Sequence, residues 1–121
     1  MWLFTRYGFF SVVCARRDGG HSAKSDPDVL MIRARKRSHL ENLAARFDTL
    51  AEVPILANHG TDYRFRIIVP KAVWKAVLAE LAEEQTWSNF KGEAERYLPE
   101  DREYTDSLHR VWGQMAKLQA G

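Results

Sequence analysis

The sequence predicts an α+β fold: a two-layer sandwich in which a mostly antiparallel sheet of four or five strands carries its helices on one face. Three observations lead to this prediction. Short β-prone stretches open the chain and return in its middle, apolar residues at helical spacing follow each group, and turn residues separate neighbouring strands. The order of elements is a variant of the ferredoxin-like arrangement, with the first strand in the place of its missing sixth element. At 121 residues, we expect a single domain over residues 1–121.

Two strands joined by a turn begin the chain. The stretch from Trp2 to Thr5 is apolar and β-prone, and Gly8 permits a turn or a bulge. The stretch from Phe9 to Val13 is apolar on both faces except at Ser11. That composition is typical of a strand that is central in its sheet or covered on both sides.

A loop and a third strand follow. The stretch "RRDGGHSAKSDPD" is rich in Gly, Ser, Asp and Pro, which predicts a loop that is flexible over residues 18–28. The stretch "VLMIRARK" then predicts a strand. Its alternation places Ile32 and Ala34 on one face and Arg33 and Arg35 on the other.

The first helix is expected to begin at "SHLE". Ser38 and Glu41 match a capping box, in which the hydroxyl accepts a backbone hydrogen bond and the carboxylate reaches back to the N-cap. Four apolar residues behind it recur at helical spacing and form one buried stripe: Leu40, Leu43, Ala44 and Phe47.

A β-hairpin is expected next. The stretch "EVPILAN" predicts a short strand, and Pro54 places it at a sheet edge or at a strand start. His59 to Thr61 supply the turn into "YRFRIIVP". Alternation in this second strand places the apolar residues on one face and Arg64 and Arg66 on the other; the apolar set is Tyr63, Phe65, Ile67 and Val69.

Helices complete the chain. Pro70 suits the first turn of an amphipathic helix that runs to about Gln85. Residues 86–100 predict a linker with at most one helical turn, begun by Ser88. The last helix is expected from about Asp101 to Gln119, with a buried stripe of Tyr104, Leu108, Val111, Trp112, Met115 and Leu118.

The arginines of the two alternating strands suggest a binding surface. If the apolar residues of these strands pack under the helices, four guanidinium groups share the helix-free face: Arg33, Arg35, Arg64 and Arg66. Guanidinium groups pair bidentately with phosphate or carboxylate and stack on bases. The first hypothesis is therefore a non-enzymatic binding or regulatory module for an anionic ligand, with a nucleotide or a nucleic acid as the first candidate.

Other functions of the same face stay open. One alternative is a solvated surface whose arginines pair with acidic side chains. Another is an interface for protein interaction or homodimer formation. The homodimer alternative arises because "FFSVV" leaves either Phe9 and Val13 or Phe10 and Val12 on the face without helices. A small enzyme of unknown chemistry is a further alternative.

Four residues in turns or linkers are secondary binding candidates. His59 lies in the hairpin turn, and Trp87, Asn89 and Lys91 lie in the linker. Loops often carry binding residues. The alternative is that Trp87 pins the linker to the core while Asn89 caps a turn.

No motif for metal, cofactor or covalent chemistry stands out. No two histidines lie at i and i+4, and no phosphate-loop or dinucleotide fingerprint occurs. Cys14 lies within a predicted strand, where a free cysteine most often behaves as a small core residue. We predict no metal site, no cofactor and no catalytic residue, and we favour a protein that is not an enzyme.

Composition limits the partners only weakly. Residues 1–40 hold eight Lys/Arg against three Asp/Glu, whereas residues 41–121 hold ten against thirteen. This bias permits an anionic partner without requiring one. No apolar run reaches the roughly 18 residues of a membrane span, and the N-terminal stretch lacks the charge order of a signal peptide. A single cysteine excludes an intrachain disulfide. We expect no membrane association and a cytoplasmic location.

Three stretches together resemble a widespread family of short bacterial proteins that carries no assigned function. They are "MWLFTRYGFFSVV", "GTDYRFRIIV", and "SNFKGEAE" followed by "YTDSLHRVWGQMAKLQ". The resemblance covers nearly the whole chain and implies a single domain. It transfers no catalytic residue, cofactor or substrate. The Gly/Ser/Asp loop is longer here than the short turn that the family implies.

Overall fold

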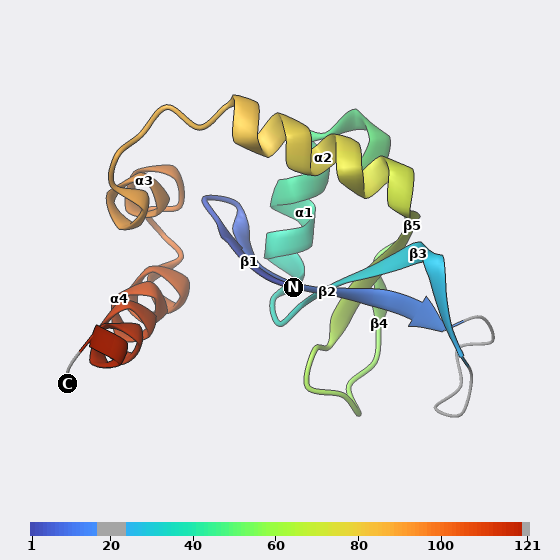
Figure 1. Cartoon of the computed structure of the whole chain (residues 1–121), viewed down its shortest axis with the longest axis horizontal. Coiled ribbons are helices and arrows are strands. Elements are labelled where there is room, and N and C mark those ends of the chain that lie inside the picture. The colour runs from blue at the N-terminus through green and yellow to red at the C-terminus, as the bar shows by residue number, and fades with distance from the viewer. Residues whose placement is uncertain (17–23, 120–121) are drawn as a thin grey trace. The chain divides into compact units, whose positions relative to one another are not determined.

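A computed structural model describes residues 1–16 and 24–119 (Figure 1). The chain forms two compact units. The first contains Met1–Phe4 and Gly8–Gln85, and the second contains Thr5–Tyr7 together with the chain from Thr86 onward. The single domain over residues 1–121 stays a prediction, because compact units of this kind also occur within one domain.

The first unit contains a five-stranded sheet in the order β1-β2-β3-β5-β4. Pairing is antiparallel between β2 and β3, between β3 and β5, and between β5 and β4. The strands are β1 (Trp2–Thr5), β2 (Gly8–Arg16), β3 (Ser25–Ala34), β4 (Leu56–Ala57) and β5 (Phe65–Pro70). The segment from β3 to α2 follows the ferredoxin-like order. The strand in the place of the missing sixth element is β2, and β1 lies outside it at the sheet edge.

Two helices cover one side of this sheet (Figure 1). Helix α1 (Arg37–Arg46) contacts β2, β3 and β5, and helix α2 (Lys71–Glu83) contacts β3 and β5. The core between the layers is apolar and includes Phe10, Ile32, Leu40, Leu43, Ile67, Val69, Trp74 and Val77. The predicted α+β fold with a sheet and a helical layer is therefore confirmed.

The start of β3 differs from the prediction. Residues 18–23 of the predicted flexible loop lie outside the described residues, but Ser25–Asp28 belong to β3, so the loop prediction is wrong there. Ser25 pairs with Arg16 of β2, whereas pairing with β5 begins at Val29. Pro27 therefore lies in the stretch of β3 where the register with β2 shifts and before pairing with β5 begins, a position that a strand proline tolerates.

The start of α1 also differs. Lys36 is the N-cap and the helix begins at Arg37. Ser38 therefore lies inside the first turn, and the predicted capping box is wrong. The apolar stripe is confirmed at Leu40, Leu43 and Phe47, which are buried, whereas its fourth member, Ala44, is half-buried.

The segment between α1 and β5 is less regular than predicted. A 3-10 helix, η1 (Asp48–Leu50), follows α1, and β4 spans two residues rather than the whole of "EVPILAN". Strand β4 is an edge strand, as Pro54 predicts. The β4–β5 hairpin is confirmed, with Leu56 opposite Arg66 and Ala57 opposite Phe65.

The second unit is helical, with α3 (Phe90–Tyr97), α4 (Arg102–Ala116) and the 3-10 helix η2 (Lys117–Gln119). The predicted linker over residues 86–100 is wrong in its centre, because α3 is a helix of eight residues. The Asn89 side chain caps it by accepting a hydrogen bond from the backbone N–H of Gly92 at 3.1 Å. Asp101 caps α4 in the same way, through the N–H of Tyr104.

The predicted stripe of α4 is buried only in its first half. Tyr104 and Leu108 are buried, but the rest of the stripe is exposed: Val111, Trp112, Met115 and Leu118. Helix α3 packs on α4. It is about 12 Å long, against about 22 Å for α4, and therefore covers only part of that helix. Within the described residues, no helix is long and apolar enough to cross a membrane.

Candidate functional site

Arg33 and Arg66 lie directly opposite each other on the helix-free face of the sheet. Arg33 pairs with Arg66 across β3 and β5, and Ser11 of β2 lies on the other side of Arg33. The neighbouring positions Ile32 and Ile67 are also paired and are buried under the helices. Side chains alternate along a strand, so both arginines lie on the opposite face.

Neutral groups hold the two guanidinium groups in place. Arg33 donates from Nη2 to Oγ of Ser11 at 2.7 Å and from Nε to the Ser11 carbonyl at 3.4 Å. Arg66 donates from Nη2 to Oγ1 of Thr61 at 2.7 Å and to the Tyr63 carbonyl at 2.8 Å. Among the described residues, no carboxylate pairs with either arginine. Their positive charges are positioned but not neutralised by that part of the chain.

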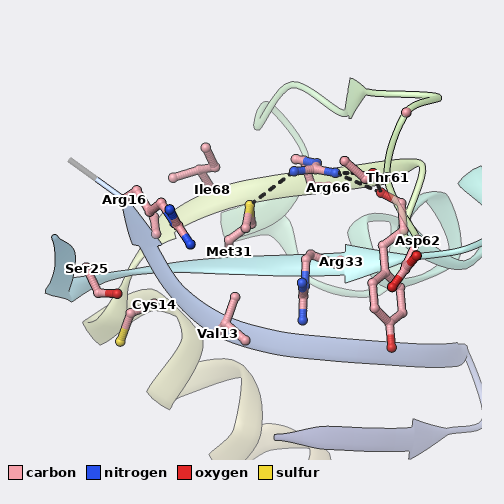
Figure 2. Close-up of a pocket in the computed structure, with 13 residues that line it drawn as sticks. Val13, Cys14, Arg16, Ser25, Met31, Arg33, Thr61, Asp62, Arg66 and Ile68 are labelled. Carbon is pink, nitrogen blue, oxygen red and sulfur yellow. Dashed lines mark hydrogen bonds between the residues drawn. The ribbon is translucent and has the colours of Figure 1, made fainter. Parts of the chain in front are cut away.

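A hollow of about 730 Å³ lies over β2, β3, β5 and the hairpin turn (Figure 2). Arg33, Arg66 and Thr61 line one part of it, and Val13, Met31 and Ile68 supply its apolar surface. Figure 2 shows Met31 beside Arg66, with its Sδ 3.7 Å from Nη1. The volume is in the range of small-molecule sites, roughly 300–1,000 Å³. A charged and an apolar surface thus meet in one hollow.

The prediction that Tyr63 lies on the helix side with Phe65 is wrong. The Tyr63 ring lines the hollow, 4.6 Å from Cζ of Arg33 and 4.7 Å from Cζ of Arg35. The alternation rule does not reach Tyr63 because β5 begins only at Phe65. The bend before it is held by the Thr61 hydroxyl, which lies 2.7 Å from the Tyr63 carbonyl oxygen.

The other two predicted arginines do not line the hollow. Arg35 is exposed, just beyond the end of β3, and reaches the site only through the ring of Tyr63. Arg64 is exposed, and its carbonyl accepts the N–H of Asn58 at 2.7 Å within the hairpin. His59 is also exposed in this hairpin, with its ring 6.5 Å from that of Phe65. The structure therefore brings together two of the four arginines, with Arg35 adjoining.

An aromatic row continues the site across the face and was not predicted. The ring of Phe9 lies 5.7 Å from Trp2, 4.6 Å from Phe4 and 6.4 Å from Tyr63, between ring centroids. Tyr63 in turn contacts Arg33. We call these four residues, Trp2, Phe4, Phe9 and Tyr63, the aromatic row. Trp2 and Phe4 are two residues apart, which indicates that they share one face of a strand. The sequence does not show that this strand pairs with β2, which carries Phe9, and so the row could not be predicted.

The "FFSVV" alternatives are also resolved. Phe10 and Val12 are buried, whereas Phe9 and Val13 belong to the opposite face with Ser11. Val13 is exposed at the margin of the hollow, as is Ile68. The helix-free face therefore carries apolar as well as cationic groups.

The three candidates from the predicted linker belong to the second unit. Asn89 caps α3, Trp87 lies under the guanidinium group of Arg6 at 5.0 Å, and the Lys91 ammonium lies 4.8 Å from the ring of Trp112. Capping of a turn by Asn89 was the expected alternative to a role in binding. Each of these side chains is thus engaged by a neighbour in its own unit.

Arg6 and Glu93 form the main polar contact of that unit. Nη1 of Arg6 donates to Oε1 of Glu93 at 2.9 Å, and the guanidinium group lies 4.8 Å from the ring of Tyr97. Arg96 donates to the same carboxylate at 2.8 Å. The hydrogen bonds from Arg96, and then those from Arg6, lower the pKa of Glu93 against the opposing effect of its burial. This carboxylate stays ionised as a structural anchor.

The described residues contain no group of three His, Cys, Asp or Glu side chains that could hold a metal ion. Cys14 is half-buried at the edge of the hollow. It pairs with Leu30, which pairs with the buried Val69, so alternation places its side chain on the helix side of the sheet, as expected of a small core residue.

Comparison with known proteins gives no match: no protein-family model, no curated protein and no solved structure matches this chain.

Proposed function

We propose that the helix-free sheet face binds an anionic ligand, with a nucleotide or a nucleic acid as the first candidate. One observation carries the proposal. Arg33 and Arg66 are directly opposite across β3 and β5, and among the described residues no carboxylate pairs with them. Like charges directly opposite in a sheet are destabilising. An anion between the two guanidinium groups relieves this repulsion and accepts charge-assisted hydrogen bonds.

The surroundings of the pair support the proposal in two further ways. Nε of Arg66 is buried, and the described residues offer it no hydrogen-bond partner. A buried unpaired donor costs free energy, and a site that receives a ligand or a water is a common reason for one. Ser11, Thr61 and the Tyr63 carbonyl also fix both side chains before a ligand arrives, which lowers the entropy lost on binding.

The test compares two arginines of the pair with one outside it. Arg33→Met and Arg66→Met keep the apolar stem and remove the charge, and Arg64→Met is the matched control on the same hairpin. Affinity for inorganic phosphate, UMP and a labelled oligouridine is measured by competition and fluorescence anisotropy at low salt. We expect each pair variant to lose about tenfold or more in affinity and the control to lose little.

Two results contradict the proposal. The first is wild-type protein that binds none of the three probes at low salt. The second is affinity that is unchanged in both pair variants although circular dichroism shows them folded.

Self-association through the same face is the second candidate function. The exposed side chains of Val13 and Ile68 favour it, because association of two sheet faces would remove both from water. It predicts a salt-tolerant dimer in light scattering that Ile68→Lys disrupts. A monomer at all concentrations contradicts it.

A further inference from the structure

The aromatic row adds a second kind of chemistry to the cationic pair. We infer that the ligand is a single-stranded nucleic acid segment, whose bases stack on the accessible rings of the aromatic row (Trp2, Phe4 and Phe9) while its phosphates meet Arg33, Arg66 and Arg35. This inference rests on the proposed function and narrows it. Base stacking on sheet aromatics beside basic side chains is a general mode of single-strand recognition.

The row has an open end and a cationic end. Trp2, at the outer strand β1, is 69% exposed, so one of the largest stacking surfaces of the chain is free for a base. Phe9 joins Trp2 to Tyr63, and Tyr63 contacts the guanidinium groups of Arg33 and Arg35. Tyr63 itself is buried (7% exposed), with both guanidinium groups against its ring. It therefore links the accessible rings of Trp2 and Phe9 to the cationic groups and does not stack on a base itself.

The distance across the sheet from Trp2 on β1 to Arg66 on β5 favours more than one nucleotide. Three strand-to-strand steps separate β1 from β5, which amounts to about 14 Å across the sheet. A single base fills only part of this distance, whereas sheet platforms of this kind stack two or three bases. A mononucleotide can occupy the hollow at the arginine pair, but it leaves Trp2 unused.

The geometry also favours a single strand over a duplex and over a second copy of the chain. Bases in a duplex are stacked on one another and cannot lie on Trp2 and Phe9. A twofold contact between two copies of this face would bring the same cationic surfaces together. The described residues that line the hollow include three arginines, Arg16, Arg33 and Arg66, against the single carboxylate of Asp62, so most of that repulsion would stay uncompensated.

The experiment separates stacking from charge. Labelled oligouridine, the corresponding RNA duplex and UMP are titrated against wild type, Trp2→Ala and Trp2→Phe. Trp112→Ala is the matched control, because Trp112 is also exposed (63%) but lies on α4. Each variant is checked for folding by circular dichroism.

We expect oligouridine to bind more tightly than UMP or the duplex. Trp2→Ala should lose at least about fivefold in oligouridine affinity, with UMP affinity unchanged, and Trp2→Phe should recover most of the loss. Trp112→Ala should bind as wild type does. In a salt titration, Arg66→Met should lower the slope of log affinity against log salt by about one, whereas Trp2→Ala should leave it unchanged.

Three results overturn the inference. Oligouridine that binds no more tightly than UMP, with no effect of Trp2→Ala, removes the aromatic row from the site and leaves the anion site standing. Duplex that binds as tightly as the single strand excludes stacking. A salt-tolerant dimer that Trp2→Ala dissociates assigns the row to a second copy of the chain. Failure of the proposed function itself is distinct: either the wild type binds none of the probes, or Arg33→Met and Arg66→Met bind UMP and oligouridine normally.

Discussion

The imidazole ring of His39 lies directly against the backbone of Gly8. A Cβ atom built on Gly8 would lie 2.6 Å from Nδ1 of His39, and Gly8 has a φ of +147°, which L side chains rarely adopt. The N–H of Phe9 donates to the same Nδ1 at 3.3 Å. The glycine therefore lets α1 approach the start of β2 closely enough for a buried histidine to accept a strand N–H.

Gly8→Ala should destabilise the protein by at least about 2 kcal/mol, because the substitution adds both backbone strain and a clash with His39. Urea unfolding followed by circular dichroism measures the change. Gly60→Ala is the control, since a Cβ there would make only one contact, at 3.4 Å. Equal stabilities of the two variants would contradict the role assigned to Gly8.

Tyr104→Phe should destabilise the protein by about 1–2 kcal/mol, because the Tyr104 hydroxyl donates to the Thr5 carbonyl at 2.6 Å and both groups are buried. The substitution leaves that carbonyl without this donor. Thermal unfolding of the two proteins at neutral pH measures the difference.

Alkaline pH should act through the same side chain. Burial raises the pKa of Tyr104 above its ordinary value of 10.0. Below pH 10 the contribution of the neutral phenol is fully present. Above it the unfolded chain loses the proton first, so stability falls as the pH rises. The melting temperature of Tyr104→Phe should fall less between pH 9 and pH 11; parallel curves would contradict the assignment.

Glu93→Gln should lower the stability of the second unit at neutral pH. The variant should also lose less stability than the wild type as the pH falls from 7 to 3. Hydrogen bonds from Arg96 and Arg6 lower the pKa of Glu93 below its ordinary value of 4.5. The contribution of the carboxylate is therefore present above pH 4.5 and is lost as the pH falls through the lowered pKa. Melting temperatures between pH 7 and pH 3 test this. The exposed Glu100, substituted by Gln, should keep the wild-type profile, and a Glu93→Gln profile with the wild-type slope would count against the anchor.

Two substitutions in the helical unit should have opposite signs. Asn89→Ala removes the cap of α3 and should cost about 1 kcal/mol. Gly113→Ala should stabilise α4 by about 0.5–1 kcal/mol, because a Cβ at Gly113 meets nothing described within 4 Å. Urea midpoints measure both. A Gly113→Ala variant less stable than wild type would show that this helix face is needed for close packing.

Within the strands, alternation was a reliable guide to the helix-free face. Arg33 and Arg66 lie where the period of two puts them, because β3 and β5 are regular over those residues. The sequence could not show that the two strands are neighbours, since strand order depends on contacts between distant segments. Their direct pairing, on which the proposed function rests, comes from the structure alone.

Strand alternation, capping motifs and apolar spacing gave wrong predictions where contacts between distant segments determine the local structure. Tyr63 departs from the alternation because the Thr61 hydroxyl and Arg66 hold the residues before β5 in a bend. The capping box at Ser38 was not used, because α1 starts at Arg37 and buries His39 against Gly8. The exposed end of α4 shows the same limit: apolar spacing predicts a face but not what covers it.

The sheet ends in two short strands, and this bears on how the protein would aggregate. Strand β4 has two residues and β1 has four, so each outer edge presents few unpaired backbone groups as a template for another chain. Fibril growth by strand addition to the folded protein should consequently be slow even in concentrated solution. Association of the folded protein would instead start from the helix-free face, where Val13 and Ile68 are exposed, and Ile68→Lys should reduce it.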